Sequence, residues 1–520
     1  MSEINFFDEE QLDAVLDLLI EQKTVKSPKL LTKSKFLNGL QCSKLLWTRC
    51  NAPQDIPDVS AALQSIFDAG HRVGELATKR FPGGASVQEE DFNKNLDETS
   101  KLLVSKTPRP IYEAGIQSGR LYARADILNP STVKSGAWDV IEVKCSTKLK
   151  DVYLQDIAYQ RYCYEKAGIL IDRCYLMHVN NAYVRNGEID PEGFFTLLDV
   201  TEEIKSFFQQ IPDFVDSFLK VIDSPTQPKV TIREYCNKPY ECQMKPVCWA
   251  FLPEGNVTQL SRGMSKRFDL LEQGVTLIKD IPSNFKLTDN QKIQRDCAIS
   301  GREHIDKAEI EKFIKGLQYP LYFMDFETIF EVIPRFDGIK PYQQVPFQFS
   351  VHIQRSPGAT VEHVSYLHKS GDDPRLAFIR SLDGCIGKDG TIIVYSQNME
   401  EGRIKELAET FPEFSASCQS MRLRMIDLLV PFRSFHYYHP NQKGSASLKK
   451  VLPVIVGQGY EGLAIAEGML ASTEYVRVTY GENVSVEDRV RVYNDLEVYC
   501  ALDTKAMVDI LKGLNELVKG

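Results

Sequence analysis

Two stretches of this chain, far apart in the sequence, have the pattern of buried β-strands that carry acidic side chains. The first comprises LYARADIL and WDVIEVKCS, which hold Asp126 and Glu142, and the second is LYFMDFE, which holds Asp325 and Glu327. Further helical and strand patterns follow each stretch. Because a new apolar strand and a second α/β pattern begin after the polar stretch 256–315, this order predicts two separate α/β domains.

The composition agrees with a folded, water-exposed protein. Of 520 residues, 43% are hydrophobic and 26% are charged, which excludes a disordered, collagen-like or coiled-coil chain. No apolar run reaches the roughly 18–20 residues that a membrane span requires, so we expect no membrane contact. The first residues, MSEINFFDEE, are acidic and lack the features of a secretory signal, which favours the cytoplasm.

We expect an α/β domain over residues 1–255, a polar and mostly helical linker over 256–315, and a second α/β domain over 316–520. The net charge of −9 argues against a histone-like basic binder, but it leaves room for an enzyme with a local basic groove. Amphipathic patterns predict helices at 8–21, 60–80, 151–167 and 201–221.

The first candidate site combines two acids and a lysine. Sixteen residues separate Asp126 from Glu142, enough for a hairpin that places their strands side by side. Glu142 and Lys144 are two residues apart on one strand and therefore share a face. Two converging carboxylates hold a divalent cation, and the lysine can stabilise charge on a phosphate. The short motif alone more often marks a surface hairpin with an ion pair.

Residues on two helices extend this motif. Gln160 and Tyr164 lie at i and i+4 on the helix that follows, where they can reach a phosphate or a base, and His71 on an earlier helix is a candidate metal ligand. The order D, E-x-K, Q-x-x-x-Y resembles the RecB-like branch of the PD-(D/E)XK nucleases over about residues 30–250. His71 departs from that family because it stands in a G-H context where the family has G-x-x-x-H.

That resemblance implies a Mg²⁺- or Mn²⁺-dependent hydrolytic site. The cation would be held by Asp126 and Glu142, with His71 as the additional ligand. The residues implied to be catalytic are Asp126, Glu142, Lys144, Gln160 and Tyr164.

Three of the 12 cysteines, Cys236, Cys242 and Cys248, fall within one short stretch, YCNKPYECQMKPVCW. A tetrahedral site needs a fourth ligand, for which Cys42 is the best candidate and Cys50 the reserve. Buried cysteines can also pack simply as small hydrophobic residues. Three cysteines after the nuclease core and one before it resemble the iron–sulfur staple of AddB-type and CRISPR-associated RecB-like exonucleases. This implies a [4Fe–4S] cluster, while the unusual spacing keeps structural Zn²⁺ as an alternative.

The second candidate site lies in the C-terminal half. Asp325 and Glu327 share one face of a strand, and Tyr499 and Asp503 share one face of a helix. Glu400, after the strand TIIVYSQ, is the best acid between them, and Asp427 is a weaker candidate. The pattern resembles the DnaQ-like (DEDD) 3′–5′ exonucleases of the RNase H-like fold, although that family usually has an Asp preceded by Asn at the place of Glu400.

The DnaQ-like resemblance implies two catalytic metal ions and a tyrosine that positions the attacking water. The implied metal ligands are Asp325, Glu327, Glu400 and Asp503, with Tyr499 as the positioning tyrosine. Each of these short motifs taken alone could instead be a strand end or a solvated helix face without a function.

Basic residues accompany both sites and suit sequence-independent phosphate contacts. They include Lys26, Lys29, Lys33, Lys35 and Lys44 before the first site, and Lys443, Lys449 and Lys450 in the second domain. The linker run LLEQGVTLIKDIP is similar to one element of a helix-hairpin-helix, and a plain helix ending at Gly274 is an equal alternative.

As a whole, the chain resembles an uncharacterised bacterial family that fuses a RecB-like nuclease domain to a DnaQ-like domain. The resemblance implies a metal-dependent nuclease that acts on single strands or ends of DNA. The chain has no G-x-x-x-x-G-K-[ST] loop, so any unwinding would need a helicase partner. A ribonuclease, a nucleic-acid-binding protein with inactive sites and a redox sensor remain alternatives.

Overall fold

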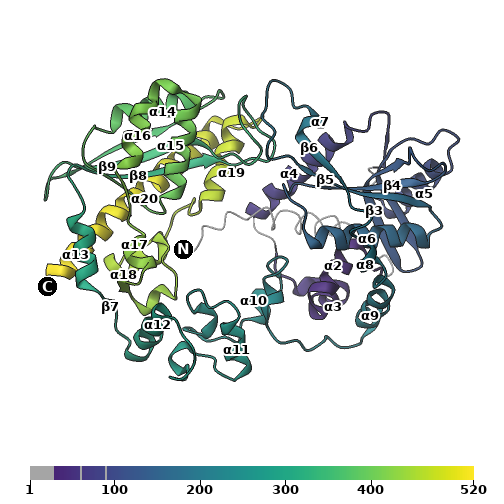
Figure 1. The fold of residues 1–520 in the computed structure, drawn as a ribbon, viewed down its shortest axis with the longest axis horizontal. Coiled ribbons are helices and arrows are strands. Elements are labelled where there is room, and N and C mark those ends of the chain that lie inside the picture. Colours follow the sequence, from purple (N-terminus) through teal and green to yellow (C-terminus); the bar gives the residue numbers. More distant parts are fainter. Residues whose placement is uncertain (1–28, 59–60, 88–90, 520) are drawn as a thin grey trace. The chain divides into compact units, whose positions relative to one another are not determined.

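The computed structural model describes residues 29–58, 61–87 and 91–519, without the side chains of 61–68. The helix expected at 8–21 and Lys26 lie outside the described residues. The chain divides into two compact units, each of mixed α/β architecture (Figure 1). The N-terminal unit extends to Phe251 and includes the segment Glu331–Gln343, and the C-terminal unit comprises Leu252–Phe330 and the residues from Gln344 onward.

The N-terminal unit is built on a six-stranded mixed sheet in the order β1-β2-β3-β4-β5-β6. The β1–β2 and β4–β5 pairs are parallel and the other neighbours are antiparallel. The hairpin expected for the first acid pair is therefore present as β3–β4. The strands are β1 (Ala85–Ser86), β2 (Ile111–Ser118), β3 (Leu121–Pro130), β4 (Trp138–Lys144), β5 (Ile171–Val179) and β6 (Phe195–Asp199).

The helices of this unit agree with the patterns at 60–80 and 151–167, which form α4 (Ala61–Thr78) and α6 (Asp151–Lys166). The expected helix at 201–221 is instead divided, because Pro212 stands in the first turn of a new helix. Phe36 of α2 (Lys33–Gln41) stacks on Tyr159 of α6 with 4.3 Å between the ring centroids, and this contact holds α2 beside α6. The other helices are α3 (Ser43–Asn51), α5 (Phe92–Leu103), α7 (Pro191–Phe194), α8 (Lys205–Phe208), α9 (Ile211–Asp223) and α10 (Lys245–Cys248).

The C-terminal unit is built on a five-stranded sheet in the order β10-β9-β8-β11-β12. Its central strand β8 is antiparallel to β9 and parallel to β11, and β9–β10 is antiparallel while β11–β12 is parallel. The strands are β8 (Leu321–Ile329), β9 (Val345–Gln354), β10 (Val361–Leu367), β11 (Thr391–Val394) and β12 (Met425–Asp427).

Hydrophobic clusters cover both faces of this sheet, because alternate residues of β8 point to opposite sides. Met324 and Phe326 pack in one cluster with α14 and α15, whereas Phe323 packs in another cluster with Met507 and Ile510 of α20. The helices are α14 (Arg375–Cys385), α15 (Asn398–Thr410), α16 (Ser415–Leu423), α17 (Val430–Arg433), α18 (Leu448–Val456), α19 (Gly468–Tyr480) and α20 (Val486–Lys519).

The segment expected as a linker folds with the C-terminal unit. It forms α11 (Lys266–Glu272), α12 (Asp289–Ser300) and α13 (Lys307–Lys315), and its strand β7 (His304–Ile305) pairs with β13 (Tyr437–Tyr438). Helix α11 is closed by a left-handed turn at Gly274, whose φ is 76°. None of the helices in the described part of the chain is long and apolar enough to cross a membrane.

Candidate metal-binding sites

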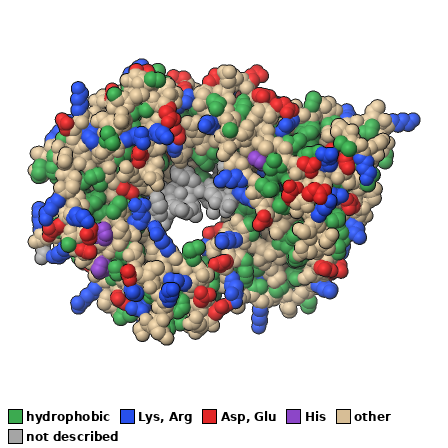
Figure 2. Space-filling model, in the orientation of Figure 1, with side chains coloured by type: hydrophobic (Ala, Val, Ile, Leu, Met, Phe, Trp, Pro, Cys, Tyr) green, Lys and Arg blue, Asp and Glu red, His purple; other side chains and the backbone are tan. Residues whose placement is uncertain are grey.

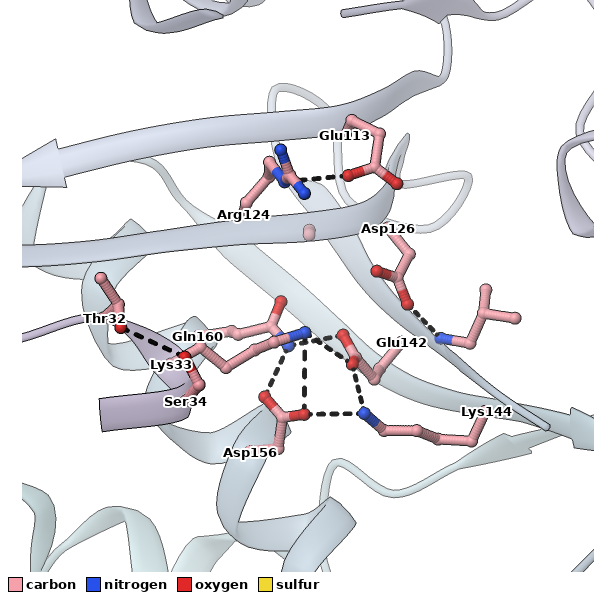
Figure 3. A network of polar contacts seen from close by, with 12 residues as sticks. Thr32, Lys33, Ser34, Glu113, Arg124, Asp126, Glu142, Lys144, Asp156 and Gln160 are labelled. Atoms are coloured by element: carbon pink, nitrogen blue, oxygen red, sulfur yellow. Dashed lines mark hydrogen bonds and ion pairs between the residues drawn. The ribbon is translucent and has the colours of Figure 1, made fainter. Parts of the chain in front are cut away.

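The first site lies on the antiparallel pair β3–β4, at the residues that the sequence singled out. Asp126 on β3 accepts a hydrogen bond from the backbone N–H of Val143 at 2.6 Å, next to Glu142 on β4 (Figure 3). Burial and the neighbouring charge of Glu142 raise the pKa of Asp126 well above its ordinary value. The two carboxylates thus oppose each other electrostatically, and a bound cation would relieve this repulsion.

Glu142 is buried, with 1% of its surface exposed, and is surrounded by donors. Lys144 Nζ lies 2.8 Å from its Oε1, and Gln160 Nε2 donates to its Oε2 at 2.6 Å. Burial alone would raise the pKa of Glu142, but the charges of Lys144 and Lys33 hold it well below its ordinary value. The glutamate is therefore ionised and oriented by Lys144 and Gln160, two of the residues that the sequence predicted.

Two further residues complete this network and were not predicted as part of it. Lys33, the first residue of α2, places Nζ 2.8 Å from Glu142 Oε1. Asp156 of α6 accepts from Lys144 Nζ at 3.1 Å and from Gln160 Nε2 at 2.9 Å. Asp156 lies one helical turn before Gln160, and this i,i+4 spacing was the one signal in the sequence.

A fourth acid, Glu113, lies on β2 beside the same strands. Its φ of 58° is in the left-handed region although it lies within β2, and its Oε2 lies 2.9 Å from Arg124 Nε. The charge of Glu113 also contributes to the raised pKa of Asp126. Non-glycine residues at positive φ often stand next to functional sites, and Glu113 fits that pattern.

Two residues predicted for this site, Tyr164 and His71, do not contact its carboxylates. The Tyr164 hydroxyl donates to the carbonyl of Ala114 and accepts from the N–H of Ala125 at 3.3 Å, so it joins α6 to β2 and β3 from within the core. His71 is exposed on α4, and no described hydrogen bond or ion pair joins it to Asp126 or Glu142. The structure brings Gln160 to the carboxylates, but it does not bring Tyr164 or His71 to them.

The second site lies on β8 and α20. Asp325 and Glu327 share one face of β8, and carboxylate oxygens of both lie within 4.8 Å of each other and of Cys500 Sγ. The thiol of Cys500, which the sequence did not single out for this site, points at Asp325 Oδ2 from 3.7 Å. Burial raises the pKa of Asp325 and of Glu327, and nearby carboxylates add to this rise. The residues present therefore suit a cation.

Asp503 faces the same carboxylates from α20 and is held by tyrosines. Tyr460 donates a hydrogen bond to its Oδ1, and the hydroxyl of Tyr499 also favours its ionised form. Burial nevertheless raises the pKa of Asp503 to about 6. Lys449 Nζ lies 5.8 Å from the ring centroid of Tyr460 and 5.9 Å from that of Tyr499, so one ammonium stands over both rings.

The two remaining acids have different environments. Glu400, in the first turn of α15, is 2% exposed, and its Oε2 has no hydrogen-bond partner among the described residues. Burial and the charge of Asp325 raise the pKa of Glu400. Asp427 instead accepts from the N–H groups of Ser396 and Leu429, each at 2.9 Å. Glu400 therefore has an unused buried oxygen near the other carboxylates, whereas Asp427 caps the backbone.

The four predicted cysteines of the N-terminal unit line one small cavity. Cys42 stands between α2 and α3, and Cys236 ends a 3-10 turn. Cys242 precedes the turn that leads into α10, and Cys248 is the last residue of α10. Cys50, the reserve candidate, packs against the hydrophobic core instead. Burial raises the pKa of Cys242 to about 12, and the other three thiols add to that rise. A cation among them would favour the thiolates.

The comparisons with known proteins name no activity. A family described as a domain of unknown function (DUF2779) matches residues 322–447, which include Asp325, Glu327 and Glu400. The chain is also similar to the "Uncharacterized protein UU173" of Ureaplasma parvum serovar 3, with 24% identity over 235 residues. This similarity covers 41% of the chain and 34% of the relative, so the chain matches about a third of that protein's length.

Proposed function

We propose that the protein is a metal-dependent nuclease that hydrolyses phosphodiester bonds of DNA at two separate sites. The main support is the buried group around Glu142, where two opposing carboxylates stand beside Lys144 and Gln160. A buried carboxylate that accepts from lysine and amide donors is costly to assemble without a function. We infer an exonuclease that acts on single strands or ends.

At the first site, Mg²⁺ or Mn²⁺ would supply a Lewis acid for the phosphate and would activate water. Asp126 and Glu142 are the residues that would hold the ion, since a cation would relieve the repulsion between their like charges. Lys144 stabilises negative charge on the phosphate, and Gln160 keeps Glu142 in its orientation. Lys33 and Asp156 balance the charges around this pair.

At the second site, the proposal rests on the carboxylates of Asp325, Glu327, Glu400 and Asp503. The antiparallel and parallel neighbours of β8 follow the strand arrangement that an RNase H-like domain has, which supports a DnaQ-like assignment. Two ions held there would stabilise the entering and leaving oxygens. Tyr499 orients Asp503 and lies where a hydroxyl can position water.

For the cysteines, we propose a [4Fe–4S] cluster, with structural Zn²⁺ as the alternative. Four thiolates at about 2.3 Å from one Zn²⁺ are about 3.8 Å apart. The four cysteines line one cavity, which suits either group. A cluster holds each thiolate on a different iron and therefore separates them more widely. We propose that it ties both ends of the N-terminal unit together.

The proposed substrate is DNA, with RNA as the alternative, because phosphate-directed lysines and carboxylate-bound metals do not separate the two. The sequence contains no phosphate-binding loop of the helicase type, so a partner protein would have to unwind duplex DNA. On the face drawn in Figure 2, basic side chains are interspersed with acidic ones. This mixture favours local contacts at the two sites over a continuous basic surface.

The test is digestion of single-stranded DNA labelled separately at its 5′ and 3′ ends, with Mg²⁺ or Mn²⁺ and anaerobically purified protein. We expect Lys144→Ala and Asp325→Ala to abolish different end-dependent activities. Lys134→Ala and Glu409→Ala, which change exposed residues of the two units, serve as matched controls and should cut like wild type.

Each alternative function predicts a different result. A ribonuclease would degrade RNA in preference to the matched DNA. If only one variant loses activity, the other unit is a binding platform. If wild type cuts neither DNA nor RNA but binds them, the nuclease proposal fails, and a change of affinity on oxidation would then indicate a redox-sensing binder.

A further inference from the structure

We propose that a cavity beside the second acidic site binds the phosphates of a single-stranded nucleic acid. The inference rests on the proposed function and names the surface by which that site would take its substrate. The cavity has a volume of about 580 Å³ and lies within the C-terminal unit. Its lining comprises Glu254, His439, Asn441, Lys443, Lys449, Lys450, Pro453, Val454 and Glu461.

Lys449 connects the cavity to the carboxylates. This residue lines the cavity, and its ammonium also stands over the rings of Tyr460 and Tyr499, 5.8 and 5.9 Å from their centroids. Tyr460 donates in turn to Asp503. A strand whose phosphates lie in the cavity would therefore extend toward the acidic site by way of Lys449.

The charges of the lining suit anionic groups along a chain. Lys449 and Lys450 are exposed in the first turn of α18, and Lys443 is 38% exposed. Lys443 Nζ lies 2.6 Å from Oε1 of Glu254, whose side chain is 78% exposed. Breaking this surface ion pair costs little free energy, so Lys443 can bind a phosphate instead. The other acid of the lining is Glu461, and its negative charge opposes that of an anion near Lys449 and Lys450.

Two neutral groups add donors to the same wall. His439 Nδ1 accepts from the N–H of Asn441 at 3.1 Å, which leaves Nε2 as the ring nitrogen that carries hydrogen. The side chain of Ser447, at the N-cap of the nine-residue helix α18, makes no capping hydrogen bond. The N–H of Lys450 donates to the carbonyl of Ser447 at 2.9 Å, so the N–H groups of Leu448 and Lys449 are the ones at this helix start that an anion can use.

The volume and the apolar part of the lining favour a strand over a free phosphate ion. Sites for small organic ligands are about 300–1,000 Å³, so this cavity exceeds what one phosphate fills. Pro453 and Val454 offer apolar surface to a sugar or base beside the lysines. Because no ordered pattern of base-reading donors accompanies them, we infer recognition of the backbone without sequence preference.

The test measures binding apart from cleavage. Full-length Asp325→Ala in EDTA is titrated with a fluorescent oligothymidylate at several salt concentrations, and anisotropy gives the affinity and its salt dependence. We expect Lys450→Gln, added to Asp325→Ala, to weaken binding several-fold and to reduce the slope of log K against log[salt] by about 0.7. Lys450→Arg should restore both, and Lys315→Gln, which changes a lysine paired with Glu311, is the control.

A second measurement locates the strand. A 4-thiothymidine strand is photo-crosslinked to Asp325→Ala protein, and the modified peptides are identified by mass spectrometry. We expect crosslinks within residues 439–461. Unchanged affinity and salt slope in Lys450→Gln, or crosslinks confined to other segments, would overturn the inference. Competition by inorganic phosphate at the same concentration as the strand's phosphates would also overturn it, since that outcome indicates a simple anion site.

These outcomes are independent of catalysis. If wild type cuts nothing but Lys450→Gln still loses binding, the nuclease proposal fails and the binding surface stands. If wild type cuts DNA while Lys450→Gln binds normally and its crosslinks lie elsewhere, the nuclease proposal stands and the cavity does not bind the strand.

Discussion

Lys33 lies 2.8 Å from Glu142 although 109 residues separate them in the chain. Two ammonium groups, those of Lys33 and Lys144, therefore meet on one buried carboxylate, and Asp156 balances the second positive charge. Because Lys33 is the first residue of α2, the packing of that helix on α6 determines where its charge lies. Lys33 is thus a positioning residue for Glu142 in the proposed nuclease site.

Lys33→Met should lower the activity of the first site about tenfold or more, as expected when a group that orients a metal-holding carboxylate is lost. The activity of the second site should not change. The measurement is the kcat of the end-dependent reaction that Lys144→Ala abolishes, together with Mn²⁺ affinity by calorimetry. Lys101→Met, which changes an exposed lysine of α5, is the control, and equal loss in both variants would contradict a specific role.

Gln160→Ala should weaken metal binding at the first site about 10–100-fold, because Glu142 loses its amide donor at 2.6 Å. The loss should appear in the metal concentration needed for half-maximal activity rather than in thermal stability alone. Gln155→Ala, on the same helix, is the control. A normal metal requirement in Gln160→Ala would show that the amide only packs.

Tyr164→Phe should reduce stability and leave activity within about twofold. The substitution removes a buried hydroxyl that serves the carbonyl of Ala114 and the N–H of Ala125, so unfolding should become easier by about 1–3 kcal/mol. Denaturant unfolding of the whole chain measures the change. A large loss of kcat with normal stability would restore the catalytic role that the motif indicates.

The sequence alone was sufficient for the parts of the first site that follow strand geometry. Asp126, Glu142 and Lys144 come together because the spacing of a hairpin and the alternation of a strand are local properties. Lys33 and Asp156 could not be chosen in this way, since a lysine near an N-cap and an acid on a helix occur on most surfaces. Their inclusion depends on tertiary packing.

The contacts of the residues on α6 could not be predicted from their spacing alone. Gln160 and Tyr164 are one turn apart, yet the amide reaches Glu142 whereas the hydroxyl bonds to the backbone of β2 and β3. The i,i+4 spacing predicts a shared face but not what that face contacts. Likewise, no motif marks Cys500 next to Tyr499, and only the approach of α20 to β8 brings its thiol to Asp325.

Without metal, the C-terminal unit should lose stability as pH rises from about 4 to about 6. The pKa of Asp503 is about 6 in the folded protein and near 3.8 when unfolded, so the folded state holds more protons in that window. Each pH unit then costs up to about 1.4 kcal/mol. The raised pKa values of Asp325, Glu327 and Glu400 add slopes of the same sign. Thermal unfolding in EDTA should show the combined slope, Asp503→Asn should reduce it, and added Mn²⁺ should stabilise most at the higher pH. A slope of the opposite sign would contradict the buried, protonated carboxyl.

Cys236→Ser should remove the proposed cluster and destabilise the N-terminal unit. The anaerobically purified wild type should contain about four iron atoms per chain and absorb broadly in the visible range, as a [4Fe–4S] protein does. Because Cys42 and Cys236 are 194 residues apart, losing their link frees a long loop and should lower the unfolding temperature of this unit. Cys50→Ser, which changes a cysteine outside the cavity, should keep both iron and stability. If the wild-type protein is colourless and contains one zinc ion, the four cysteines bind zinc and not a cluster. If it is free of metal and fully stable, the four thiols only pack.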